Sequence, residues 1–493
     1  MGQSVDRTHF SEQEYARFRR GLADDLDRLR GLLADPQFGR GPGSMGAELE
    51  VYIIDEKGRP LGRNQEILAG MADEQLTLEL NRFNLEYNLA PVAIAEQPFF
   101  HTEKQLQGAL QAMGREAAVY GGRIVPVGIL PTLALEDFDH RTMTDLPRYH
   151  ALRERLRTER DGLFRIDIRG QDELSLATDD ITLEGANTSF QLHYRVQPDA
   201  FTDTFNAIQL VTPLVLALAS NSPVVFGRRL WHETRIPLFK KSIDSRNESA
   251  PDSGQWQQPA RVNFGHGWLR YGADELFAEA IRLYTPLLPI IREVDPAATV
   301  PPLNELRLQM GTIWLWNRPV YDDADGGHLR IEMRALPSGP TPADMMANSA
   351  LMIGLAEGLR PQIRDLITAL PFRHATHNFY QAARAGVGAS LVWPRLDQSG
   401  LEARPVTELV TELLPIADAG LQSIGIASEE RDHYLGIIAE RVEGRCSAAR
   451  WQLDRLAELE SHCARPEALR LMLESYHEFS CSNIPVARWR GMQ

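Results

Sequence analysis

Four stretches of the sequence alternate apolar and polar residues with a period of two, and each carries chemically capable side chains on its polar side. In the first stretch, residues 45–55, Glu48 and Glu50 lie on one side of a strand and apolar residues on the other. Two carboxylates one pleat apart repel each other unless a cation, a basic side chain or bulk water lies between them. This stretch therefore predicts a half-buried strand whose polar face is either solvated or holds a cation.

The other three stretches repeat this design. Their polar positions are Asn84, Glu86 and Asn88 within residues 83–89, Ser189, Gln191, His193 and Arg195 within residues 189–196, and His328, Arg330, Glu332 and Arg334 within residues 328–335. Four strands with polar faces can belong to one sheet, with helices covering one side and a cavity on the other. We predict such a sheet.

Pooled on one face, the polar residues combine carboxylates, neutral groups and cations: Glu48, Glu50, Glu86, Glu332, His193, Gln191, Asn88, Arg195, Arg330 and Arg334. Hard oxygen donors suit Mg²⁺ or Mn²⁺, and an imidazole suits Mn²⁺ better or contacts a phosphate oxygen. Arginines beside carboxylates make sense if a polyphosphate shares the site, because phosphoryl transfer depends on positioning and charge neutralisation. Since the sequence lacks G-x-x-x-x-G-K-[ST], a nucleotide would be held by metals and arginines on the sheet.

Each residue could also have a purely structural role. Glu86 and Glu332 alone are more often salt-bridged surface residues, His193 alone is more often a structural histidine, and Arg-x-Glu-x-Arg can be a cross-strand ion-pair ladder. A two-carboxylate glycosidase is disfavoured because Glu48 and Glu50, two apart on one strand, do not flank a scissile bond. The recurrence of one polarity on four strands favours the joint functional interpretation.

Composition bounds the class of protein. The chain has 493 residues, of which 43% are hydrophobic and 24% charged, as in soluble globular proteins. A formal charge of −15 disfavours nucleic acid as the main partner. Three widely spaced cysteines without a C-x-x-C pair fit neither a zinc site nor a disulfide framework, so a reducing cytoplasm is the expected compartment.

Neither a membrane span nor a dinucleotide site is expected. The N-terminus lacks the order of a signal peptide, and the longest apolar stretch, residues 208–219, is too short to span a bilayer. Residues 41–46 formally match G-x-G-x-x-G, but they precede a strand instead of opening a helix.

Helices are predicted at both ends of the chain. Residues 11–34 form an amphipathic helix with Ser11 and Glu14 as a capping box, expected to pack on the body of the protein. The alternative is that this helix forms a dimer contact, so a homo-oligomer is possible. Residues 123–130 predict an apolar strand, residues 136–185 loops and short helices, and residues from about 341 onward a helical region.

Several of these strings together resemble a known family. They are GAELEVYIID, NLEYN, TSFQLHYRV, ASNSPVVFGRR, TIWLWNRPVYD and HLRIEMRALPSGPTPADMMANSA. The sequence is similar to glutamate–cysteine ligase family 2, carboxylate–amine ligases with a glutamine-synthetase-like catalytic sheet. The likeness runs in order from about residue 45 to about 395 and is weaker beyond. Its most specific motifs are W-x-W-N-R-P at residues 314–319 and the E-x-R followed by L-P-S-G-P.

The resemblance implies an α+β fold, with a mainly antiparallel curved sheet whose polar face is catalytic. Helices would pack on the other side, as in glutamine synthetase and guanido kinases. The chain would divide into an N-terminal helical extension at 1–40, a catalytic sheet domain at 41–395 and a helical C-terminal region at 396–493.

The resemblance also implies roles for individual residues. The metal-binding residues map onto Glu48, Glu50, Glu86 and Glu332, with His193 as a further ligand or phosphate contact. Arg334 would stabilise the transferring phosphoryl group, so that Arg334, Glu332 and Arg235 are the expected catalytic residues. Arg330, Arg195, Arg148 and Gln191 are the expected co-substrate contacts. For Arg235 and Arg148, ordinary surface charge is the alternative.

One departure concerns Gln191. The family often shows H-x-H on this strand, and the sequence has Gln191-Leu-His193. Glutamine is a poorer metal ligand than imidazole, so the occupancy or identity of one metal stays open.

The implied reaction is ATP-dependent amide formation with Mg²⁺ or Mn²⁺. A substrate carboxylate attacks the γ-phosphorus of ATP to form an acyl phosphate, and an amine then displaces phosphate. The γ-carboxylate of glutamate and the amine of cysteine are the default substrates, although the sequence does not identify the amine. Two alternatives stay open at this point, a guanidino-type phosphotransferase and a non-catalytic nucleotide-binding homologue.

Overall fold

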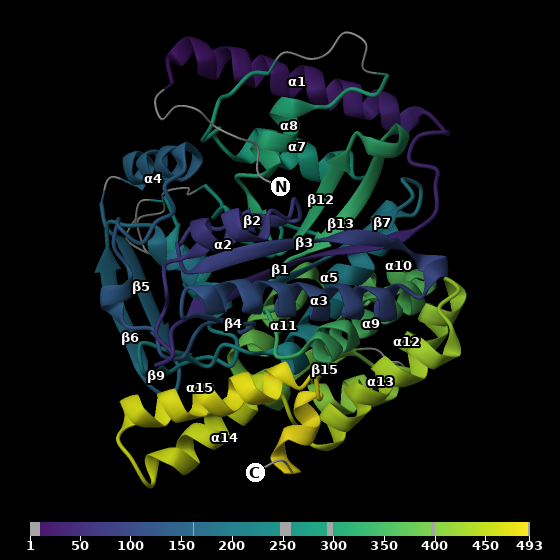
Figure 1. The fold of residues 1–493 in the computed structure, drawn as a ribbon. Coiled ribbons are helices and arrows are strands. Elements are labelled where there is room, and N and C mark those ends of the chain that lie inside the picture. Colours follow the sequence, from purple (N-terminus) through teal and green to yellow (C-terminus); the bar gives the residue numbers. More distant parts are fainter. Residues whose placement is uncertain (1–9, 161, 247–257, 293–298, 396–399, 492–493) are drawn as a thin grey trace.

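The computed structural model describes residues 10–160, 162–246, 258–292, 299–395 and 400–491. A seven-stranded antiparallel sheet lies at the centre of this described part (Figure 1). Its strand order is β12-β13-β7-β1-β3-β2, with β4 beside β1. The strands are β1 (Ser44–Ile54), β2 (Leu76–Leu78), β3 (Asn84–Ala93), β4 (Arg123–Val125), β7 (Phe190–Val196), β12 (Asn317–Asp322) and β13 (His328–Met333). The sheet and its helices confirm the predicted α+β class.

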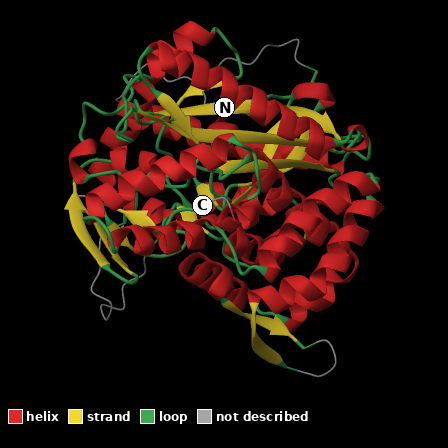
Figure 2. Ribbon diagram, turned by 60° about the horizontal axis from the view of Figure 1, so that its bottom comes forward, coloured by secondary structure: helices red, strands yellow, loops and turns green. Residues whose placement is uncertain are grey.

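Helices surround this sheet on both sides. They are α1 (Glu12–Ala34), α2 (Asn64–Met71), α3 (Pro98–Val119), α4 (Pro147–Arg160), α5 (Phe201–Ala219), α6 (Arg235–Ser242), α7 (Asp274–Leu283), α8 (Asn304–Met310), α9 (Pro342–Leu359), α10 (Ile363–Ala369), α11 (Phe372–Ala385), α12 (Val406–Ser423), α13 (Ser428–Glu443), α14 (Ala448–Glu460) and α15 (Arg465–Cys481). In Figure 1, α1, α7 and α8 lie on one side of the sheet, and α3, α5, α9 and α12 on the other. Figure 2 shows how helix dominates the lower half of the molecule.

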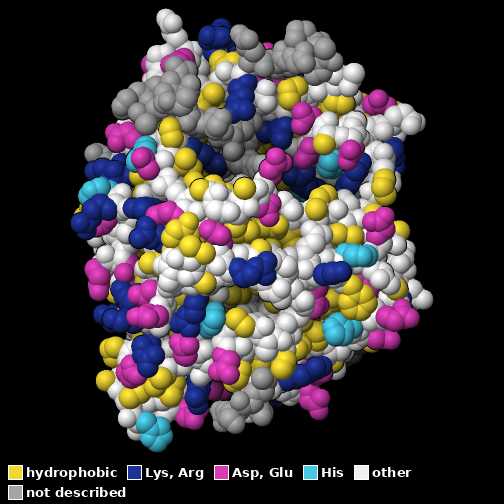
Figure 3. Space-filling model, viewed as in Figure 1, with side chains coloured by type: hydrophobic (Ala, Val, Ile, Leu, Met, Phe, Trp, Pro, Cys, Tyr) yellow, Lys and Arg dark blue, Asp and Glu magenta, His cyan; other side chains and the backbone are white. Residues whose placement is uncertain are grey.

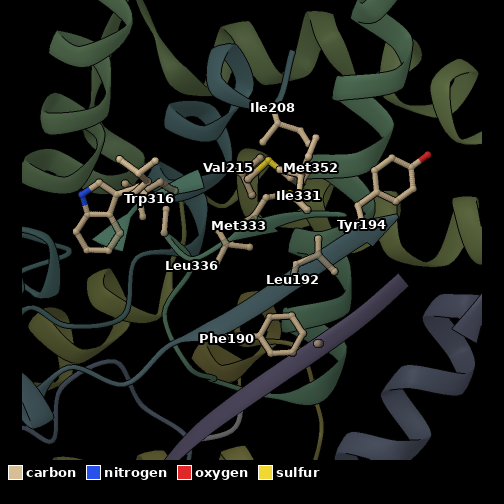
Figure 4. Packing of buried hydrophobic residues seen from close by; sticks show 14 of the residues in the cluster. Phe190, Leu192, Tyr194, Ile208, Val215, Trp316, Ile331, Met333, Leu336 and Met352 are labelled. Carbon is tan, nitrogen blue, oxygen red and sulfur yellow. The ribbon is translucent and has the colours of Figure 1, made fainter. Parts of the chain in front are cut away.

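The apolar side of the sheet packs on α5 and α9. Leu192 of β7 and Met333 of β13 are fully buried, and Figure 4 shows them facing Val215 and Met352. The burial of these side chains is the main force that fixes which face of each strand points inward. Helix α5 is long and apolar enough to cross a membrane, but 89% of its window is buried in the protein, as in the core helix of a soluble protein.

Helix α1 packs on α7 and α8, as expected from its apolar stripe. Phe18, Leu22 and Leu29 are buried, and the Ser11–Glu14 capping box is present. Asp25 also accepts a hydrogen bond from the backbone N–H of Leu306 at 3.2 Å. Because the apolar stripe is covered within the chain, α1 needs no second copy to bury it.

Three local predictions need correction. The strand predicted at 123–130 ends at Val125, because Pro126 has no N–H to donate to a ladder. Within 136–185 lie a 14-residue helix, α4, and the hairpin of β5 (Phe164–Arg169) and β6 (Glu173–Thr178). The helical region after 341 is interrupted by the hairpin of β14 (Ser390–Pro394) and β15 (Leu401–Pro405).

The division of the chain at residues 40 and 395 stays a prediction. Its second boundary adjoins residues 396–399, which lie outside the described residues. On the face shown in Figure 3, acidic and basic side chains of the described residues are interspersed, so this face presents no extended basic surface.

Candidate active site

Strand register brings the four predicted polar faces together. Glu50 of β1 lies opposite Glu86 of β3, and Glu332 of β13 lies opposite His193 of β7. Glu48 of β1 lies between its neighbours on β3 and β7. The antiparallel order β13-β7-β1-β3 therefore places Glu48 and Glu332, which are 284 positions apart in sequence, on one surface.

A first group, here called the carboxylate triad, consists of Glu50, Glu79 and Glu86. One carboxylate oxygen of each lies within 4.8 Å of the others. The hydrogen bonds to Glu50 come from neutral donors, the Ser189 backbone N–H at 2.6 Å and Gln191 Nε2 at 2.8 Å. The triad therefore concentrates carboxylates, and no guanidinium of the residues that the structure describes is bonded to them directly.

The protonation of the triad reflects this crowding. Burial and the neighbouring charge of Glu86 raise the pKa of Glu50 to about 8, although Arg334 opposes the shift. Burial and the charges of Glu86 and Glu50 also raise the pKa of Glu79 well above its ordinary value. Like charges this close favour a shared proton or a bound cation, and three oxygen ligands suit Mg²⁺ or Mn²⁺.

A second group, here called the histidine group, consists of Glu48, His193 and Glu332, whose ligand atoms also lie within 4.8 Å of one another. His193 Nε2 is 3.2 Å from Glu48 Oε1 and 3.8 Å from Glu332 Oε1. This nitrogen is buried and makes no hydrogen bond of good geometry among the described residues. An unpartnered buried nitrogen between two carboxylates fits an incoming cation or phosphate oxygen.

Arg330 sets the tautomer of His193. The Nε–H of Arg330 donates to His193 Nδ1 at 3.1 Å, and a guanidinium has no acceptor. Nδ1 is therefore the accepting nitrogen, and in a neutral ring the proton lies on Nε2. In this arrangement His193 is a donor suited to a phosphate oxygen; as a metal ligand through Nε2, it would require Arg330 to move.

Glu332 is held by two arginines. Arg318 of β12 makes a two-point ion pair, with Nε 2.7 Å from Oε2 and NH2 2.8 Å from Oε1. Arg334 NH1 lies 3.2 Å from Oε2. Burial alone would raise the pKa of Glu332, but Arg318, Arg334 and His193 hold it well below its ordinary value. Glu48 behaves similarly, because His193 outweighs burial and lowers its pKa to about 2.

A cavity of about 470 Å³ lies over the histidine group. Glu48, His193 and Glu332 line it on the sheet side. Its wall comes from α7, α8 and the loops beside them and includes apolar residues such as Phe277 and Leu308. Arg148, Arg195, Arg307, Arg318 and Arg330 also line the cavity. A cavity with an apolar wall and several guanidinium groups fits an anionic ligand with an apolar part, such as a nucleotide.

The predicted co-substrate contacts fall in different places. Arg195 and Arg330 line the cavity, and Arg330 also pairs with Asp322 at 2.6 Å. Gln191 lies beneath the triad, where its Nε2 donates to Glu50 and its Oε1 accepts from Arg334 NH1. An amide can do both at once, whereas a neutral imidazole has a single donor and a single acceptor in fixed directions. Gln191 thus links Glu50 to Arg334.

Arg148 and Arg235 have different surroundings. Arg148, on α4, lines the cavity and has no hydrogen bond or ion pair within the described part of the chain. Arg235 is 2% exposed, pairs with Glu233 at 3.1 Å and lies over the Trp316 ring at 5.7 Å. Arg235 also donates to the Ala335 carbonyl, next to Arg334, and its positive charge opposes the rise in the pKa of Glu50, so this guanidinium is buried beside Arg334 and Glu50 and is not surface charge.

One member of the triad and one carboxyl near it were not predicted from the sequence. Glu79 follows the three-residue strand β2, and the alternation Leu76, Leu78, Leu80 was the signal that could have revealed it. Glu184 lies on the 3₁₀ turn Thr182–Ala186, where burial raises its pKa to about 7 against the opposing charges of Arg334 and Arg148. No periodicity marks that turn.

The comparison with family models identifies the chain. The model of glutamate–cysteine ligase family 2 (GCS2) matches residues 44–474, which include both acidic groups and the whole sheet. The chain belongs to glutamate–cysteine ligase family 2. The resemblance found in the sequence motifs is thereby confirmed for the family.

Individual relatives are more distant. The glutamate–cysteine ligase of Haloquadratum walsbyi is 25% identical over 213 residues, which are 41% of this chain and 47% of the relative. The chain thus matches about half the length of that curated relative. A glutamate–cysteine ligase structure from Francisella tularensis superimposes with a TM-score of 0.54 and 12% identity, covering 92% of this chain and 93% of the other. This second similarity confirms the glutamine-synthetase-like ligase fold.

Proposed function

We propose that this member of the family is an ATP-dependent carbon–nitrogen ligase that joins the γ-carboxylate of glutamate to an amino acid, cysteine being the default. The observation that supports it is the pair of acidic groups on one sheet face, with Arg334 between Glu332 and Gln191. Two acidic groups that could each hold a divalent cation, on either side of one buried arginine, suit phosphoryl transfer to a carboxylate.

The donor sets fit divalent cations. The carboxylate triad offers three hard oxygen ligands, and the histidine group offers two carboxylates beside the Nε2–H of His193, which suits a phosphate oxygen of the bound nucleotide. Bound there, Mg²⁺ or Mn²⁺ would neutralise charge on the phosphates of ATP and on the transferring group. The nucleotide complex named for the Francisella structure, with AMP, agrees with a nucleotide as co-substrate.

The two groups suggest a division of the site. The histidine group lines the cavity together with Arg195 and Arg330, so we assign this side to the nucleotide phosphates. The carboxylate triad lies on the β2–β3 side, so we assign it to the substrate carboxylate. Arg334 contacts both sides through Glu332 and Gln191, which suits stabilisation of the phosphoryl group as it passes between them.

Arg148 and Glu184 support an amino acid as substrate. Neither side chain has a hydrogen bond or ion pair among the described residues, and the positive charge of Arg148 opposes the rise in the pKa of Glu184. An unpaired guanidinium and an unpaired carboxylate beside the triad can bind the carboxylate and ammonium of one zwitterion. In this assignment the buried Arg235 pairs with Glu233 and contacts no substrate.

The test is release of orthophosphate from Mg²⁺-ATP. Glutamate and the other standard amino acids are supplied singly and in pairs with glutamate. Release that needs glutamate together with a second amino acid would support the ligase and name the amine. Formation of ADP with a phosphorylated product and no orthophosphate would instead identify a phosphotransferase and contradict the proposal.

Two additions sharpen this test. Glutamate labelled with ¹⁸O in its γ-carboxylate should transfer one labelled oxygen to phosphate if an acyl phosphate forms, since that oxygen becomes the bridge to phosphorus. Glu332→Gln should abolish release, whereas Glu154→Gln, the same change at an exposed position on α4, should not. Absence of label in phosphate would refute the acyl phosphate.

A further inference from the structure

Arg318 belongs to the W-x-W-N-R-P motif, and the proposed function assigns no role to this motif. It lies directly opposite Glu332 in the β12–β13 register. Both of its ion-pair distances to Glu332, 2.7 and 2.8 Å, are those of strong charge-assisted hydrogen bonds. Each guanidinium nitrogen contacts a different carboxylate oxygen, so the pair fixes the plane of the carboxylate as well as its distance.

The other contacts of Arg318 hold its guanidinium in place for the pair with Glu332. Within the described part of the chain Arg318 has one further hydrogen bond, from Nη1 to the Met310 carbonyl at 3.2 Å, which anchors the guanidinium to the end of α8. Arg334, the other arginine at Glu332, also donates to Gln191. The Glu332 side chain is 2% exposed, and that of Arg318 is 16% exposed where it lines the cavity.

The geometry has a chemical consequence for Glu332. With both oxygens held by Arg318, the carboxylate cannot turn to chelate a cation through its two oxygens. Its Oε1 remains beside His193 Nε2, at 3.8 Å, on the side of the histidine group. A carboxylate fixed in this way offers a cation a single oxygen in a set direction, and such outer hydrogen bonds commonly tune metal affinity.

We propose that Arg318 is a positioning residue for the metal–nucleotide site: it orients Glu332 as a one-oxygen ligand within the histidine group. The inference rests on the proposed function. It predicts that loss of the two-point pair weakens the cation bound with nucleotide while leaving the fold intact.

The test measures Mn²⁺ binding by electron paramagnetic resonance in the presence of a non-hydrolysable ATP analogue, without catalysis. Arg318→Met should weaken nucleotide-dependent Mn²⁺ binding by about 10- to 100-fold, the usual effect of removing a residue that is hydrogen-bonded to a metal ligand. Arg318→Lys should also weaken it, because an ammonium is a point charge and cannot hold both oxygens. In a turnover assay, the Mg²⁺ concentration for half-maximal rate should rise by a similar factor, and saturating Mg²⁺ should restore most of kcat.

Arg488→Met is the matched control. Arg488 makes the same two-point pair with Glu440, at 2.8 and 2.7 Å, far from the cavity. Unchanged Mn²⁺ binding in Arg318→Met, or an equal loss in Arg488→Met, would overturn the inference. If Arg318→Met does not fold, Arg318→Lys decides it alone. Absence of Mn²⁺ binding in the unsubstituted protein would instead refute the metal site, and the role of Arg318 with it.

Discussion

At the scale of single residues, the two acidic groups differ in how their charge is balanced. Glu332 is paired with Arg318 and Arg334, whereas among the described residues the Glu50 carboxylate is bonded only to the neutral Ser189 and Gln191. Negative charge that is not paired within the protein is available to a cation. The carboxylate triad should therefore bind a divalent cation even without nucleotide, and the histidine group should depend on the phosphates.

Glu79→Gln tests this difference. It removes one oxygen ligand and one negative charge from the triad, so nucleotide-free Mn²⁺ binding should weaken by about tenfold or more. Glu74→Gln, the same change at an exposed position on the preceding loop, should leave binding unaltered. Equal affinities of the two variants, measured by electron paramagnetic resonance titration, would show that Glu79 is not a ligand.

At the scale of elements, period-two alternation predicted the four polar strands because buried and exposed positions must alternate on a half-buried sheet. Which carboxylates meet depends on register between strands far apart in sequence, and local pattern contains no information on it. Glu48 and Glu50 were therefore pooled into one site, although they belong to different groups. The partner of Arg318 depends on the register of the β12–β13 hairpin, which alternation alone does not fix, and the burial of Arg235 depends on the tertiary packing around α6.

Helix α1, which precedes the residues matched by the family model, packs on the wall of the cavity. Helix α1 buries Leu29 against α7 and α8, and α8 carries Leu308 and Met310, which line the cavity. Leu29→Ala should cost about 2–5 kcal/mol of local stability, since it leaves a cavity at a fully buried position.

That loss should appear in α8 and in the site. Amide hydrogen exchange of residues 304–310 should accelerate in Leu29→Ala, and the ATP analogue should bind more weakly because the wall is less fixed. Arg20→Ala, at an exposed position of α1, is the control. Unchanged exchange in α8 would show that α1 does not support this wall.

At the scale of the whole molecule, the triad couples folding to pH and to divalent cations. Its carboxyls hold protons more tightly in the folded chain than in the unfolded one, and the pKa of Glu50 is about 8. The folded state then binds more protons than the unfolded state, so the free energy of unfolding falls as pH rises through this range. Buried His232, whose pKa is about 4, has the opposite effect, but only below the ordinary histidine pKa.

The window from about pH 7 to 8.5 lies above the histidine contribution, and comparison of Glu79→Gln with Glu74→Gln separates the triad from the thiols of Cys446 and Cys481, whose pKa values burial also raises. Without divalent cations, Tm should fall across this window, and the slope should be smaller in Glu79→Gln than in Glu74→Gln. Added Mg²⁺ should raise Tm more at pH 8.5 than at pH 7, because cations and protons compete for the same oxygens and binding to the folded state alone is stabilising. A Tm that rises with pH in the cation-free protein, or a Mg²⁺ effect that is equal at both pH values, would mean that the triad is already neutralised within the fold. In that case the unpaired charge of Glu50, Glu79 and Glu86 could not be what recruits the metal.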